Sequence, residues 1–232
     1  MECDEVLAWL RRRGRRANVE GMARFGITAT RAFGVSMADM RPLARRIGRD
    51  HELAAELWTS GWHEARILAS LVDDPAQVTR RQMEQWVRDF DNWAVCDSVC
   101  MHLFDRTPHA WGKVALWTRR QREFQRRAGF ALIASLALHD KAAPDAVFER
   151  VLPLIERYAD DPRNFVKKAV NWALRQVGKR NLALHRLALD LATRLAQSES
   201  AAARWVGSDA RRELAAAAVA ARLKRREARS AG

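Results

Sequence analysis

The chain has 232 residues, of which 48% are hydrophobic, and its 41 basic and 28 acidic residues give a formal net charge of +13. This length and apolar content are enough to bury a core without a disulfide or a metal, and they exclude a disordered chain. The charge favours nucleic acid as a partner, because phosphate backbones attract excess positive charge. The alternative is a basic surface that serves solubility alone.

The sequence contains no apolar run that approaches the ~20 residues of a membrane span. At the N-terminus, acidic residues precede a short apolar stretch (MECDEVLAWLRRRGRR), the reverse of a secretory signal. We therefore expect a cytoplasmic protein, associated with the nucleoid when it binds DNA.

Helix-forming residues dominate the whole chain. Alternating apolar and polar runs are missing, glycine and proline are few, and Ala, Leu, Arg and Glu fill long windows. We predict an all-α protein of about a dozen helices of roughly 10–18 residues, joined by loops of about two to six residues.

Two early helix starts carry capping residues. Ser36, with Asp39 three residues later, predicts a helix to about residue 50. Thr79 with Gln82 predicts a second helix to about residue 90.

Further boundaries follow along the chain. Asn92 is expected to cap a helix that carries two cysteines, a tryptophan and an aspartate. Pro108, Pro144 and Pro162 are each placed just inside a helix start, where the missing N–H costs nothing. Gly178 is placed at a helix end.

A faint internal repeat indicates stacked helices. His63–Leu71 resembles Arg127–Leu136, with Ala-Ser-Leu recurring in both. After each copy we expect an Asp-containing turn, a helix, and then a helix with a tryptophan, Trp93 in the first case and Trp172 in the second. Helical pairs that cannot bury their faces alone must stack.

No long linker or composition shift divides the chain. We predict a single domain over residues 1–223, with a frayed basic tail over 224–232. The expected architecture is a HEAT-like or armadillo-type α-α superhelix with a concave basic surface.

The three cysteines form neither a CxxC pair nor an even framework. Cys96, Cys100 and His102 lie within two turns of one expected helix, which is poor geometry for zinc. We interpret Cys96 and Cys100 as buried apolar thiols and predict no metal site.

Two tryptophan motifs have spacings that place polar groups beside an aromatic ring. Trp93 and Asp97 are four residues apart and share a helix face, as do Trp172 and Arg175, three apart. Between the motifs lies a dense cationic stretch, in which Trp111 and Trp117 precede Arg119, Arg120, Arg122, Arg126 and Arg127.

Spacing alone leaves two interpretations of these motifs open. A carboxylate beside tryptophans and arginines suits a cationic ligand held next to a phosphate chain. The other interpretation is that the tryptophans are core residues and the charged residues form a solvated face.

Three segments in order carry a resemblance to a known family. The strings Trp93-Ala-Val-Cys-Asp97, Phe124-Gln-Arg-Arg127-Ala and Lys168-Ala-Val-Asn-Trp172-Ala-Leu-Arg175 resemble the bacterial DNA alkylation repair family, the AlkD-type alkylpurine DNA glycosylases built from HEAT-like repeats. The segment from Phe33-Gly-Val-Ser36 to Ile47-Gly48 also looks like the early region of that family. The similarity runs from about residue 25 to 223.

The resemblance implies roles for four residues. Asp97 matches the catalytic carboxylate, Trp93 and Trp172 match the aromatic residues that flank the damaged nucleotide, and Arg127 matches the arginine at the DNA backbone. One departure is Ala94, where the glycosylases of the family often have an acidic residue. The family also includes members that bind DNA without catalysis.

The neighbouring basic residues are expected to contact DNA, and they are Arg126, Arg175, Lys167, Lys168, Lys179 and Arg180. No metal or organic cofactor is implied. The expected partner is double-stranded DNA containing alkylated bases, bound by a monomer.

Three functions follow as hypotheses. The first is a monofunctional glycosylase that excises 3-methyladenine and 7-methylguanine in base-excision repair. The second is a catalytically inactive HEAT-like protein that binds damaged or branched DNA. The third is a protein-scaffolding HEAT module, against which the positive charge argues.

Overall fold

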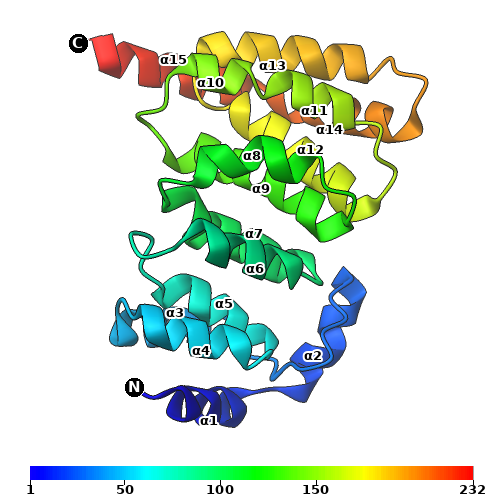
Figure 1. Cartoon of the computed structure of the whole chain (residues 1–232). Coiled ribbons are helices and arrows are strands. Elements are labelled where there is room, and N and C mark those ends of the chain that lie inside the picture. Colours follow the sequence, from blue (N-terminus) through cyan, green and yellow to red (C-terminus); the bar gives the residue numbers. More distant parts are fainter. Residues whose placement is uncertain (232) are drawn as a thin grey trace. The chain divides into compact units, whose positions relative to one another are not determined.

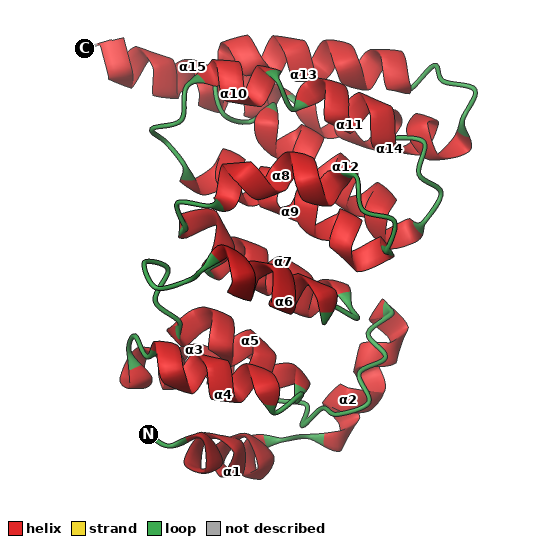
Figure 2. Cartoon of the chain, in the orientation of Figure 1, coloured by secondary structure: helices red, strands yellow, loops and turns green. Residues whose placement is uncertain are grey.

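The structure, a computed structural model, describes residues 1–231, with side chains up to Arg229. Within that range it contains fifteen α-helices, two short 3-10 helices and no strand (Figure 2). The all-α prediction is therefore confirmed. The chain divides into two compact units, Met1–Ala110 and Trp111–Gly232.

The first unit is organised around one central helix. Its elements are α1 (Cys3–Arg13), α2 (Arg16–Met22), η1 (Ala23–Phe25), α3 (Met37–Ile47), α4 (His51–Thr59), α5 (His63–Val72), α6 (Arg80–Arg88), α7 (Trp93–His102) and η2 (Phe104–Arg106). Helix α5 packs against α3, α4 and α7 (Figure 1). Eight of its ten residues are buried, including the polar His63, Glu64 and Ser70, because helices pack against it on several sides.

The second unit is built on a long buried helix. It contains α8 (Ala110–Thr118), which begins at the boundary, α9 (Glu123–His139), α10 (Asp145–Glu149), α11 (Leu152–Tyr158), α12 (Asn164–Val177), α13 (Leu182–Leu195), α14 (Ala201–Leu214) and α15 (Ala217–Ala231). Helix α9 packs along α12, which also contacts α13 and α14. A Cβ at Gly129 would lie 2.5 Å from the backbone nitrogen of Thr118, so a glycine is needed where α8 and α9 meet.

The three predicted N-caps are confirmed. Ser36, Thr79 and Asn92 each accept a hydrogen bond from the backbone N–H three residues later, at 3.2, 3.1 and 3.1 Å. The first two helices end at Ile47 and Arg88, slightly earlier than expected.

The proline placements just inside helix starts were wrong. Pro144 is the residue before α10, in extended backbone, and Pro108 and Pro162 also precede the first residues of α8 and α12. Proline lacks an N–H and holds φ near −65°, which suits the extended residues before a helix as well as its first turn. Gly178 does end α12, as predicted, although its backbone stays in the right-handed helical region with φ −67°.

The internal repeat is present only in part. Its first copy is followed by one helix, α6, and then by the tryptophan helix α7, as predicted, whereas two short helices, α10 and α11, separate the second copy from α12. The two similar segments lie in α5 and α9, and each helix ends at an aspartate, Asp73 and Asp140. The serine of the shared Ala-Ser-Leu is fully buried in both copies. Its hydroxyl donates to a carbonyl of its own helix, Ser70 to Ile67 at 2.7 Å and Ser135 to Ala131 at 2.8 Å.

Both ends of the described chain are helical. Helix α1 contacts α4 and α5 and buries Val6 and Leu10 completely. At the other end, residues 224–231 continue α15, whereas a frayed tail was expected there. Alanine, arginine, lysine and glutamate are strong helix formers, which accounts for the continuation.

A buried glutamate holds the loop that leads into α3. Glu64 is 1% exposed and accepts backbone N–H bonds from Phe33 at 2.9 Å, Gly34 at 2.7 Å and Val35 at 3.3 Å. Gly34 has φ +80°, and a Cβ there would lie 2.2 Å from the carbonyl oxygen of Arg15. The loop therefore needs both the carboxylate and the glycine.

Three tryptophans belong to the cores of the units. Trp58, Trp86 and Trp117 are buried, and the rings of Trp58 and Trp86 stack with centroids 4.0 Å apart. For these residues the packing interpretation is confirmed. Among the described residues, no helix is long and apolar enough to span a bilayer.

Candidate functional site

Trp93 and Asp97 lie on a partly exposed face of α7. Asn92 caps the helix, Trp93 is its first residue, and Asp97 follows one turn later. Both side chains are half-buried, while Cys96 and Cys100 face the core. The shared helix face that the spacing predicts is therefore present, and it is partly open to solvent.

The ring of Trp93 is hydrogen-bonded to a residue far from it in the sequence. Its indole Nε1 donates to the backbone carbonyl of Phe25 at 2.9 Å. The Phe25 side chain itself is 70% exposed. Both residues line an apolar groove of about 600 Å³, together with side chains that include Met22, Ile27, Met37, Met40 and Ile67. Trp93 thus borders an open apolar surface and is not enclosed by it.

The two thiols of α7 behave as core residues. Cys96 and Cys100 are fully buried, and burial raises the pKa of the Cys100 thiol well above its usual value. The ring Nδ1 of His102 lies 2.9 Å from the Ser98 carbonyl oxygen. Among residues 1–231, no group of three or more His, Cys, Asp or Glu side chains is arranged to hold a metal ion.

Arg127 connects two helices of the second unit. It lies in the second turn of α9 and is 6% exposed. Its Nη1 donates to the carbonyl of Phe165, in the first turn of α12, at 2.5 Å. This bond from the guanidinium positions the start of α12 against α9.

Arg126 takes part in a separate ionic cluster. Its guanidinium pairs with Asp161 at 2.6 Å and lies 4.7 Å from the centre of the Tyr158 ring. Arg163 pairs with the same carboxylate. Burial alone would raise the pKa of Asp161, but hydrogen bonds from Arg163 and Arg126 outweigh it and lower the pKa to about 2.

Trp172 lies in the second half of α12, whereas Trp93 begins its helix. It is half-buried, and Arg175 follows on the same face. Arg175 pairs with Glu213 of α14, and the Lys179 ammonium lies 2.6 Å from the same carboxylate. Both predicted DNA-binding cations therefore share one acidic partner.

The two lysines at the start of α12 are more open. Lys168 is exposed, and the Lys167 ammonium lies 4.8 Å from the ring centre of Trp205, a residue of α14 that is 38% exposed. These residues form a basic and aromatic surface on the α12–α14 pair.

Arg180 makes contacts that stabilise the fold. Its guanidinium donates to the carbonyls of Ala137, Asp140 and Ala143 at 3.1, 2.8 and 3.1 Å. It also lies 3.9 Å from the centre of the Phe148 ring. Burial lowers its pKa from the usual value, and nearby carboxylates oppose that effect. The guanidinium of Arg180 is already hydrogen-bonded to the carbonyls at and after the end of α9. Its expected contact with DNA stays a prediction.

The partners of these residues were not apparent in the sequence. Phe25 is 68 residues from Trp93, Asp161 is 35 from Arg126, and Glu213 is 38 from Arg175. No local pattern indicates contacts at such separations.

Comparison with known proteins places the chain among helical repeat proteins. A solved structure described as "A new family of proteins related to the HEAT-like repeat DNA glycosylases with affinity for branched DNA structures" is 21% identical, with a TM-score of 0.75 and 83% of each chain covered. A designed armadillo repeat protein in complex with a (KR)4 peptide is 13% identical over 81% of this chain and 84% of its own, with a TM-score of 0.36. No curated protein matches the chain. The first likeness confirms the predicted HEAT-like helical fold.

A family profile covers nearly the whole sequence. The family described as "DNA alkylation repair enzyme" matches residues 6–230, a range that includes α7, α9 and α12. The chain therefore belongs to the DNA alkylation repair enzyme family.

Proposed function

We propose that this protein is a monofunctional DNA glycosylase that hydrolyses the N-glycosidic bond of positively charged alkylated purines, such as 3-methyladenine and 7-methylguanine, in double-stranded DNA. The observation that carries the proposal is the half-buried pair of Trp93 and Asp97 on one face of α7. Membership of the DNA alkylation repair enzyme family supports it.

Asp97 would act on the sugar and on the attacking water. Alkylation makes the base a good leaving group, so it departs as a neutral purine without needing a proton from the enzyme. The deoxyribose then carries positive charge, which an ionised carboxylate stabilises. The same carboxylate orients the water that adds to the sugar and releases a proton.

Trp93 and Trp172 would hold the damaged nucleotide. A tryptophan face attracts a cationic base with about 0.5–2 kcal/mol. Both rings are half-buried, so each keeps part of its surface open to a ligand. The family resemblance implies that the base stays stacked during the reaction, with contacts made mainly to its deoxyribose.

Some of the basic residues would contact the DNA backbone directly, and others would position the helices that carry them. Lys167 and Lys168 are the best placed of them, because Lys168 is exposed and the Lys167 ammonium lies over the partly exposed ring of Trp205. Arg127 and Arg126 position α12 and the turn before it, and Arg175 and Lys179 would exchange Glu213 for phosphate. The concave arrangement of these groups stays a prediction.

The proposal is tested by base release from a duplex that contains 7-methylguanine. Wild type is compared with Asp97→Asn, and Asp190→Asn, an exposed residue of α13, serves as the charge-matched control. We expect release by wild type and the control, and a loss of at least a hundredfold for Asp97→Asn with duplex binding retained. Equal rates for all three proteins would remove the role of Asp97.

A second candidate is DNA binding without catalysis. Ala94 follows Trp93 where the glycosylases of the resembled family often carry an acidic residue, and the similar solved structure belongs to proteins with affinity for branched DNA. Tight binding of four-way junctions, together with no base release by wild type, would favour this function over the first.

A further inference from the structure

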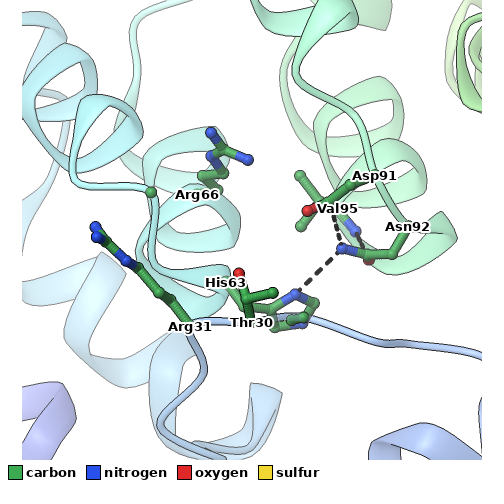
Figure 3. Close-up of a pocket in the computed structure, with 9 residues that line it drawn as sticks. Thr30, Arg31, His63, Arg66, Asp91, Asn92 and Val95 are labelled. Carbon is green, nitrogen blue, oxygen red and sulfur yellow. Dashed lines mark hydrogen bonds between the residues drawn. The ribbon is translucent and has the colours of Figure 1, made fainter.

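A small polar pocket lies in the first unit, where three chain segments meet (Figure 3). They are the loop before α3, the turn between α4 and α5, and the turn between α6 and α7. The polar residues of its lining that matter here are Arg31, His63, Arg66, Asp91 and Asn92. Its volume of about 10 Å³ admits one atom the size of a water oxygen.

Two arginines border the opening. Figure 3 shows Arg31 and Arg66 on one side of it and Asp91 and Asn92 on the other. Arg66 is held by its packing 5.1 Å from the Trp58 ring centre. A guanidinium has five N–H donors, so the few carbonyl contacts of Arg31 and Arg66 leave donors for a ligand.

The local charge favours an anion. Helices α5 and α7 both begin at this pocket, and their N-terminal N–H groups add partial positive charge to that of the arginines. Asp91 adds one carboxylate to the lining, with its Oδ1 accepting from the Asn92 amide at 2.7 Å, so the two guanidinium groups of Arg31 and Arg66 exceed it by one positive charge. The nearby Glu64 carboxylate faces the N–H groups of the loop before α3. Burial lowers the pKa of His63, so this side chain is neutral near pH 7.

We propose that this pocket binds one non-bridging oxygen of a DNA phosphodiester, with Arg31 and Arg66 gripping the rest of the phosphate from outside. The volume accepts a single oxygen and excludes a base or a sugar, while two guanidinium groups suit the geometry of phosphate. Asn92, which lines the pocket, directly precedes Trp93. The site would therefore fix the backbone close to the nucleotide at Trp93, and in this respect it rests on the proposed function.

The first test is the salt dependence of binding to an undamaged duplex. Each phosphate contact contributes about −0.9 to the slope of log K against log salt concentration. We expect Arg31→Gln to make this negative slope shallower by about one and to weaken binding severalfold at low salt. The control is Arg45→Gln, which removes one exposed arginine of α3 away from the pocket. Equal slopes for the two variants would overturn the assignment.

The second test locates the contact. A series of duplexes, each with one uncharged methylphosphonate linkage, is bound by wild type, Arg31→Gln and Arg66→Lys. Wild type should lose affinity at one linkage, and Arg31→Gln should show no further loss there. Arg66→Lys keeps the charge, so it should retain the salt slope. The affinity difference between the unmodified duplex and the duplex with the methylphosphonate at that linkage should be smaller than for wild type. Thermal unfolding of each variant reports on folding.

Two further outcomes are informative. Binding of inorganic phosphate by wild type but not by Arg31→Gln, with unchanged DNA slopes, would show a free-phosphate site and overturn the DNA assignment. Absence of base release with the slope change intact would instead remove the glycosylase proposal and leave the pocket as a DNA contact.

Discussion

The indole nitrogen of Trp93 donates a hydrogen bond to the carbonyl of Phe25, 2.9 Å away and 68 residues earlier in the sequence. This bond ties η1 to the first residue of α7, the helix that carries Asp97 one turn later. The position of the proposed substrate-contacting ring therefore depends on the segment between α2 and α3.

Replacing Trp93 by phenylalanine should loosen this segment. The variant keeps an aromatic face but loses the N–H donor, and a hydrogen bond of this kind contributes about 1 kcal/mol or less. We expect faster amide exchange over residues 23–27 and a drop in base release smaller than that of Trp93→Ala. Unchanged exchange in Trp93→Phe would show that the bond does not hold η1 in place.

Loss of the Asp161 carboxylate should destabilise the second unit. Asp161→Asn leaves Arg126 and Arg163 without their shared acidic partner, and breaking a buried pair in this way costs about 3 kcal/mol. Urea unfolding monitored by circular dichroism measures the loss. Asp160→Asn, at the exposed neighbouring position, is the matched control and should unfold like wild type.

The lowered pKa of Asp161 should make the free energy of unfolding depend on pH in the acid range. Its pKa falls from an ordinary 3.8 to about 2 in the folded protein, where the hydrogen bonds from Arg163 and Arg126 outweigh burial. A lowered folded pKa stabilises the protein above about pH 4, and the contribution, about 2 kcal/mol, is lost as the pH falls towards 2. The difference in unfolding free energy between wild type and Asp161→Asn should shrink over this range. A difference that stays constant from pH 5 to about pH 2 would contradict the assignment.

Removing the charge of Glu213 should strengthen DNA binding. Glu213→Gln releases Arg175 and Lys179 from their shared carboxylate and makes both available to phosphate. We expect affinity for a duplex to rise roughly three- to tenfold at low salt, with a steeper salt dependence. Glu227→Gln changes the net charge equally at an exposed position of α15. A similar gain in both variants would mean that only net charge matters.

Glu64 should be among the most sensitive positions of the first unit. Glu64→Gln replaces an acceptor of three backbone N–H bonds by a group with two donors of its own. We expect a loss of about 2–4 kcal/mol in unfolding free energy, because buried N–H groups are left without an acceptor. The comparison is Glu52→Gln, exposed in α4, for which a change below about 0.5 kcal/mol is expected.

The local features of the fold could be predicted because their causes lie within a few residues. The caps Ser36, Thr79 and Asn92 bond to the N–H three positions later, so the sequence contains both partners side by side. The spacing of Trp93 and Asp97 likewise needed only the period of a helix. The prolines were misplaced because the same φ restriction suits a residue before a helix and one inside its first turn.

The surroundings of the site were decided by tertiary structure alone. Nothing near Arg175 in the sequence indicates Glu213, and nothing near Trp93 indicates Phe25. The sequence determined an all-helical chain, its caps, its charge and the spacing of its key residues, because these depend on neighbours along the chain. Packing determined which cations are paired, which rings stay open and where the small polar pocket beside Asn92 forms, because these depend on side chains that only folding brings within hydrogen-bond distance.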